Sequence, residues 1–172
     1  MHLHPVVPGL KGCQLVFAGK RRYMAYKEIK HYHSDSLPFM WNVSKPVGFC
    51  MTNEKGDVAL VQMLLVTCYD KGDVTQLKVD GTCGPKTRQA IKKFQTEYSI
   101  HSTANGLLPL EIDGIVSRAD NFGFDTSSGV TAYTIFALNW MAYTYEMHKW
   151  LNLAYDPAVP LYLRSQLRNS GG

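Results

Sequence analysis

The stretch that decides the fold runs from Val79 to Gln95 and reads VDGTCGPKTRQAIKKFQ. Asp80-Gly81 predicts a turn, because glycine accepts a positive φ and an aspartate side chain can bond the backbone just downstream. Pro85 suits the first position of a helix, where its missing N–H costs nothing. The stretch therefore predicts a turn that leads directly into a helix.

The helix expected after Pro85 has an apolar face and a basic remainder. Its apolar positions are Ala90, Ile91, Phe94 and Tyr98, and its basic ones are Lys86, Arg88, Lys92 and Lys93. This spacing is typical of a helix that packs along one side. We expect Phe94 to be buried, so that Phe94→Ala lowers the free energy of unfolding by about 3–5 kcal/mol.

The same turn occurs twice. Leu77 to Gly81 reads LKVDG, and 33 residues later Leu110 to Gly114 reads LEIDG. Two copies are too few for a solenoid, which needs at least three repeats to bury a continuous core. The sequence therefore predicts an internally duplicated small domain in which helices alternate with the two Asp-Gly turns.

Helices are expected on both sides of this pair of turns. The first is capped by Asp57 and has apolar residues at helical spacing, namely Val58, Val61, Leu64, Leu65 and Cys68. The last runs from Thr131 to about Leu153, with a stripe formed by Ile135, Leu138, Ala142 and Tyr145. Further aromatic and apolar residues spread around it, namely Trp140, Tyr143, Met147 and Trp150. A helix that is apolar nearly all round is buried on more than one side. We therefore expect these four to face the N-terminal segment or a neighbouring chain.

Residues 1–50 differ in character from the rest. They carry seven Lys or Arg against two acidic residues, in a chain whose net charge is +4. Without a sustained period they predict an irregular arm with some strand or short helix. A basic arm suits an acidic polymer or an acidic protein face. No motif of a nucleic-acid reader accompanies the charge, so we expect no nucleic-acid partner.

Metal, cofactor and disulfide chemistry find little support. The cysteines, Cys13, Cys50, Cys68 and Cys83, match no zinc-ligand spacing and are expected to stay reduced. The histidine pairs His2/His4 and His31/His33 lack an identifiable third ligand. No stretch reaches the roughly 18–20 apolar residues of a membrane helix. We expect no metal, no cofactor and no membrane insertion.

The chain from Asp57 to Leu138 resembles the peptidoglycan-binding domain family, a small three-helix module of cell-wall hydrolases and some metalloprotease propeptides. The resemblance rests on Val61-Gln62 and Leu65, on the block 79–95, and on the IDGIV run at 112–116. It implies a mainly α fold: a three-helix core with two Asp-Gly turns, a short-strand arm and an extended aromatic last helix. The corresponding organisation is an arm at 1–53, a domain at 54–155 and a tail at 156–172.

Two departures from the family pattern stand out. Residues 117–130 form an insertion where the family continues directly into its last helix, and Cys83 occupies a position usually held by an aromatic or aliphatic residue. The motif itself is expected to serve the fold through Gly81, Gly84, Pro85, Thr87, Ala90, Phe94, Asp113 and Gly114. A polar cleft beside the first turn would bind glycan through Asp80, Thr82, Lys86 and Gln95, with Tyr69 stacking on a sugar.

The resemblance implies a non-catalytic cell-wall glycan-binding module. No GxSxG or HExxH element is present, and about 50 residues on either side leave little room for a catalytic domain. The N-terminus lacks the pattern of a signal peptide, which predicts synthesis in the cytoplasm and action at the cell envelope or within a particle. We therefore expect a subunit of a phage-tail-like, injection or envelope assembly, with peptidoglycan and other subunits as partners. The alternative is a structural subunit that uses the fold for protein contacts; a small cell-wall hydrolase is the third reading.

Overall fold

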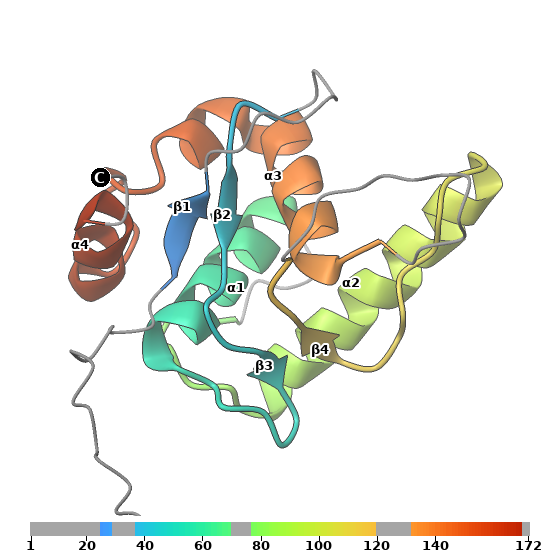
Figure 1. Cartoon of the computed structure of the whole chain (residues 1–172), viewed down its shortest axis with the longest axis horizontal. Helices are drawn as coiled ribbons and strands as arrows, with labels where there is room; N and C mark the ends of the chain where they lie inside the picture. The colour runs from blue at the N-terminus through green and yellow to red at the C-terminus, as the bar shows by residue number, and fades with distance from the viewer. Residues whose placement is uncertain (1–24, 29–36, 70–76, 120–131, 170–172) are drawn as a thin grey trace, which may run out of the picture.

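The computed structural model describes residues 25–28, 37–69, 77–119 and 132–169. Its helices are α1 (Lys55–Cys68), α2 (Pro85–Ala104), α3 (Thr134–Leu151) and α4 (Leu161–Asn169). Its strands are short: β1 (Tyr26–Glu28), β2 (Met40–Asn42), β3 (Val47–Gly48) and β4 (Ile115–Val116). The predicted mainly α fold with a short-strand arm is confirmed (Figure 1).

Helix α1 lies at the centre of the molecule. Every residue from Gly56 to Leu65 is buried, because α3 packs along one side of α1 while α2, α4 and β3 contact others. The helix begins at Lys55 with Glu54 as its N-cap, so the prediction that Asp57 caps it was wrong. Asp57 is buried and instead accepts hydrogen bonds from the Ser44 backbone N–H and hydroxyl.

Helix α2 has the apolar face that its sequence predicts. Ala90, Ile91, Phe94 and Tyr98 are all buried, and the Phe94 and Tyr98 rings stack with centroids 5.9 Å apart. Figure 1 shows α2 crossing the molecule from the β3–β4 corner to a projecting end. Of the basic residues of α2, Lys86 and Lys92 are exposed, whereas Arg88 and Lys93 are half-buried.

The strands tie the N-terminal part of the chain to the helices. Strands β1 and β2 pair antiparallel, with Tyr26 opposite Asn42. Strands β3 and β4 pair antiparallel, with Val47 opposite Val116. The second pairing joins the segment before α1 to the segment that follows the second Asp-Gly turn.

The end of α3 is covered by the same chain. Trp150 is fully buried, and its ring stacks on Phe39 with centroids 4.5 Å apart. The Trp150 indole N–H donates to Asn139 Oδ1 at 3.0 Å. Of the two alternatives expected for Trp150, burial against the N-terminal segment or against a neighbouring chain, the structure shows the first. Trp150 is therefore not exposed for contact with another subunit.

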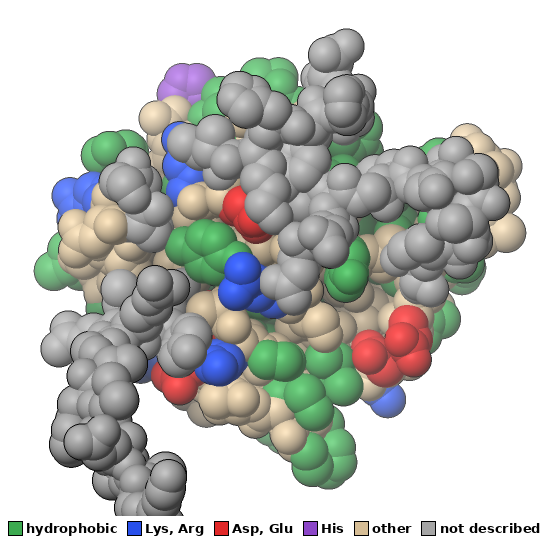
Figure 2. Space-filling view, viewed as in Figure 1, with side chains coloured by type: hydrophobic (Ala, Val, Ile, Leu, Met, Phe, Trp, Pro, Cys, Tyr) green, Lys and Arg blue, Asp and Glu red, His purple; other side chains and the backbone are tan. Residues whose placement is uncertain are grey.

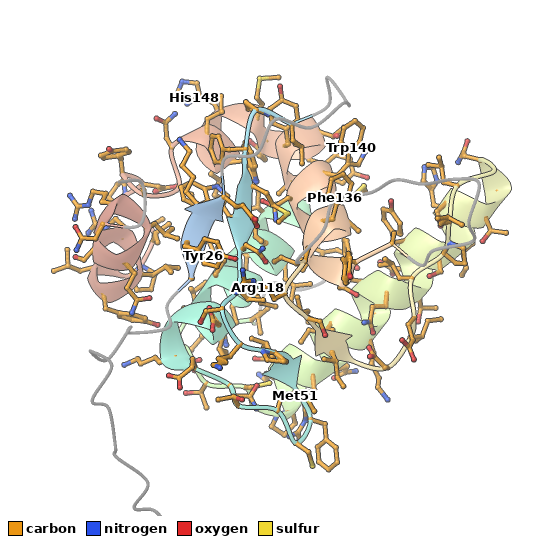
Figure 3. All side chains as sticks on the ribbon, in the orientation of Figure 1. Tyr26, Met51, Arg118, Phe136, Trp140 and His148 are labelled. Carbon is orange, nitrogen blue, oxygen red and sulfur yellow. The ribbon has the colours of Figure 1, made fainter. Side chains whose placement is uncertain are left out.

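The apolar stripe expected along α3 does not reach as far as predicted. Ile135, Leu138 and Ala142 are buried, whereas Tyr145 is exposed. Glu146, the next residue, has non-helical angles, φ −138° and ψ 56°, so the last turn is rotated relative to the helix before it. Met147 is also exposed, while Tyr143 and Trp140, the latter labelled in Figure 3, are half-buried.

Helix α4 was not predicted from the sequence, which was read as a tail. Leu163 and Leu167 are buried, and they provide its single apolar pair one turn apart. The α4 side chains pack on the start of α1, where Gln166 lies against the bare Cα of Gly56. A fourth helix therefore supplements the expected three-helix core.

Candidate functional site

The first Asp-Gly turn is held by a buried glutamine of α1. The Gln62 amide nitrogen lies 3.0 Å from Asp80 Oδ1, 3.1 Å from the Thr82 carbonyl and 3.0 Å from Thr87 Oγ1. Its amide oxygen accepts the Gly81 N–H at 2.9 Å. Gln62 thus joins α1, the turn and the first residues of α2 in one polar joint.

The second turn is built in the same way. The Gln95 amide nitrogen lies 2.9 Å from Asp113 Oδ1, 3.0 Å from the Ile115 carbonyl and 3.1 Å from Thr134 Oγ1. Its amide oxygen accepts the Gly114 N–H at 2.8 Å. In each turn the aspartate Oδ1 also accepts the N–H two residues on, at 2.8 Å in both cases.

The two joints are copies of one unit. Gln62 and Gln95 are 33 residues apart, and so are Asp80 and Asp113. Thr134 follows Thr87 by 47 residues, and the extra residues lie between the second turn and α3. The duplication seen in the sequence therefore extends to the glutamine, the Asp-Gly pair and the threonine of each joint.

This arrangement corrects the role given to Gln95. It was expected beside Asp80 at an open cleft, but it is fully buried and its amide serves the second turn. Gln62 is the glutamine beside Asp80, and sequence reasoning gave it no role at the site. The offset of 33 residues that relates the two turns also relates these glutamines and could have identified both.

Three of the expected glycan-binding residues lie together at the first turn. Asp80, Thr82 and Lys86 are exposed, at the turn and in the first turn of α2. Hydrogen bonds from the Gln62 amide and the Thr82 N–H hold the pKa of Asp80 below its ordinary value of 3.8. The turn therefore presents an ionised carboxylate, a hydroxyl and an ammonium group to solvent.

Tyr69 lies elsewhere. It follows the end of α1, and its hydroxyl donates to Glu97 Oε2 at 2.6 Å. Lys93 Nζ lies 5.4 Å from the centroid of its ring. Since Glu97 is ten residues after Thr87, this contact is about 15 Å further along α2 than the first turn. The structure does not bring Tyr69 to the Asp80 surface.

Helix α4 covers one side of the first turn. Gly81 has a φ of +77°, and a Cβ on it would lie 2.7 Å from the Lys55 carbonyl and 2.8 Å from the Tyr162 hydroxyl. Burial, with a smaller contribution from the charge of Asp80, raises the pKa of Tyr162. At the second turn, the methylene chain of Lys92 lies in the corresponding place over Gly114.

The thiols of Cys50, Cys68 and Cys83 are free, and burial raises the pKa of Cys68 and Cys83. The described residues hold no group of three or more His, Cys, Asp or Glu able to bind a metal. Cys13 and both expected histidine pairs, His2/His4 and His31/His33, lie outside the described ranges. Among the helices that the structure describes, none is both long and apolar enough to cross a bilayer.

Two turns, each locked by a buried glutamine between successive helices, define a small helical module built by duplication. Residues 54–119 match the family model described as "Putative peptidoglycan binding domain", the family that the sequence resembles. No curated protein and no solved structure matches the chain. The family match supports peptidoglycan binding in general and implies action at the cell wall.

Proposed function

We propose that the chain is a non-catalytic peptidoglycan-binding subunit that uses the surface of its first Asp-Gly turn. The observation that carries this proposal is the pair of glutamine-locked turns inside the matched segment. Asp80, Thr82 and Lys86 offer acceptor, hydroxyl and cationic groups that suit sugar hydroxyls and peptide amides or carboxylates. Because the joint already fixes the turn, binding would order few additional groups.

A non-catalytic role is supported by the state of the buried reactive groups. The Asp57 carboxylate is occupied by hydrogen bonds from Ser44 and Lys45, on the side of α1 away from solvent. The Cys68 thiol lies 3.6 Å from the Leu138 carbonyl, and its raised pKa keeps it protonated at neutral pH. A protonated thiol is a poor nucleophile. Both groups therefore act in packing.

The test is cosedimentation of the full chain with purified peptidoglycan sacculi. The expected result is saturable binding with no release of soluble sugar or peptide over the same period. Lys86→Ala should weaken binding, whereas Arg168→Ala, an exposed cation on α4, should not. Absence of binding by the unmodified chain would refute the proposal, and soluble products would refute its non-catalytic part.

A second candidate is that the chain is a structural subunit of a phage-tail-like, injection or envelope assembly. Large apolar side chains are exposed along the end of α3 and the start of α4, namely Tyr145, Met147, Leu151, Tyr155 and Leu161. Exposed apolar surface of this kind is typical of protein contacts. Light scattering of the purified chain and of Met147→Lys would test self-association through this surface. A wild-type chain that remains monomeric at every concentration would count against self-assembly.

A further inference from the structure

The loop between β3 and α1 holds an exposed aromatic ring on a constrained backbone. Phe49 is 64% exposed. Cys50 and Asn53, in the same loop, have positive φ angles of 57° and 53°. Residues other than glycine avoid this region, and cysteine lacks the local hydrogen bonds that let asparagine enter it. Strained backbone of this kind persists only where the surroundings impose it.

The Asn53 side chain imposes the loop's shape. Its Oδ1 accepts the Gly48 N–H at 2.9 Å, and its Nδ2 donates to the Gly48 and Met51 carbonyls, both at 2.9 Å. The Asn53 backbone N–H donates to the Pro46 carbonyl at 3.3 Å. Four hydrogen bonds from one residue therefore fix the six-residue loop 49–54, in which the Phe49 ring is not packed into the core.

Basic groups of α2 stand beside the ring. The Arg88 guanidinium carbon lies 5.3 Å from the Phe49 ring centroid, which places a cation over one face. The exposed surface of the ring is then its other face and its edge. Lys92 follows Arg88 by one helical turn and extends over Gly114. The Asp113 carboxylate beside it has its Oδ1 occupied by the Gln95 amide and the Ile115 N–H.

The loop lies at one corner of the molecule (Figure 3). Figure 3 shows Met51 at the tip of the loop below β3, next to the start of α2. Figure 2 shows apolar side chains projecting at the same corner. Phe49 and Asn53 precede residue 54, where the family match begins, so this loop is outside the matched segment.

We infer that Phe49 is a stacking platform for a sugar ring of the peptidoglycan strand, and that Arg88 and Lys92 bind the carboxylates of the attached peptide. This inference rests on the proposed function and names a second contact surface for it. An aromatic face with adjacent polar groups suits a ligand that has an apolar sugar face and anionic substituents. A fixed loop binds such a ligand without a large cost of ordering.

The experiment compares exposed aromatic residues in the full chain. Phe49→Ala should weaken binding to intact sacculi by about tenfold, while Phe49→Tyr keeps most of it. Tyr155→Ala is the matched control, since Tyr155 is 68% exposed but lies beyond α3, and it should bind as the wild type does. Arg88→Gln should weaken binding to intact sacculi and leave binding to peptide-free glycan strands unchanged.

A measurement on the unmodified chain guards against a folding defect. Titration with a soluble disaccharide-peptide fragment, followed by amide NMR, should shift the resonances of Gly48 to Asn53 and of Arg88. If the chain binds sacculi but these resonances do not move, or Phe49→Ala binds normally, the inference is overturned and the proposed function stands. If the unmodified chain binds no sacculi, the proposed function fails and this inference fails with it.

Discussion

The indole nitrogen of Trp41 donates a hydrogen bond to the backbone carbonyl of Trp150 at 3.0 Å, across 109 positions of the chain. The Trp41 backbone takes part in the same cluster, because its N–H donates to Asn139 Oδ1 at 3.0 Å and its carbonyl accepts from Asn139 Nδ2 at 2.9 Å. Strand β2 is thereby fixed to α3 by buried bonds in both directions. The segment before α1 is part of the core, which has consequences for stability.

Loss of either tryptophan should destabilise the whole fold. Trp41→Ala and Trp150→Ala should each lower the free energy of unfolding by about 3–5 kcal/mol, because each leaves a cavity and a broken hydrogen bond. Tyr155→Ala, at an exposed position, should change it by less than about 0.5 kcal/mol. Urea unfolding measures all three. A Trp41→Ala variant as stable as the wild type would show that β2 is not part of the cooperative unit.

The two glutamine joints should be of comparable importance. Gln62→Ala and Gln95→Ala should each lower the free energy of unfolding by about 2–3 kcal/mol, since each leaves buried partners without a hydrogen bond. Gln89→Ala, which removes an exposed glutamine from α2, serves as the control and should have little effect. If Gln95→Ala behaved like Gln89→Ala in urea unfolding, the second joint would not contribute to stability.

Backbone strain and crowding at the first turn can be separated. Gly81 and Gly106 have similar φ angles of +77° and +71°, but a Cβ at Gly106 would meet nothing within 4 Å. Gly106→Ala should therefore cost only the strain of a left-handed residue, about 1–2 kcal/mol. Gly81→Ala should cost more, because the new methyl group would also press on Lys55 and Tyr162. If thermal unfolding showed equal losses of stability for the two variants, α4 would be able to move away from the new methyl group without a measurable cost.

Much of the fold follows from short-range patterns, and what was missed depends on contacts distant in sequence. Asp80-Gly81 and Phe94 could be read directly, because a turn signal and a helical period are local properties. The burial of Gln95 could not be read in this way. A polar side chain is buried only where it finds hydrogen-bond partners, and those of Gln95, Asp113 and Thr134, are distant in sequence. The exposed Phe49 was missed for a related reason, since its loop has no period and is fixed by Asn53.

Acid should weaken the contribution of Asp80 to the stability of the folded chain. Its pKa is lowered in the folded chain, so the stability it contributes is present above the ordinary value of 3.8 and is lost as the pH falls through the folded value. Asp80→Asn should therefore be less stable than the wild type at neutral pH, by a small amount because the carboxylate is exposed to solvent. Unfolding measured at decreasing pH should show this difference shrinking. A difference that grows in acid would contradict the assignment.

Asp57 should titrate in the opposite sense. Burial raises its pKa, although hydrogen bonds from Ser44 and Lys45 oppose the shift. Stability linked to its proton is present below the ordinary value of 3.8 and is lost as the pH rises through the folded value. Carboxyl NMR should therefore give Asp57 a midpoint above that value and Asp80 a midpoint below it. The reverse order would show that Asp57 is hydrated in solution.

Helix α2 contributes to both joints, Thr87 to the first and Gln95 to the second. These residues are eight positions apart, which is about 12 Å along the axis and a little over two turns. One residue inserted between them would rotate Gln95 by about 100° relative to Thr87 and turn its amide away from Asp113. The length of this interval is thus set by the geometry at its two ends. Substitutions within this interval are tolerated as far as helix packing allows. An insertion or deletion there would change the angle between Thr87 and Gln95 about the helix axis, so that both residues could no longer bond their turns at once.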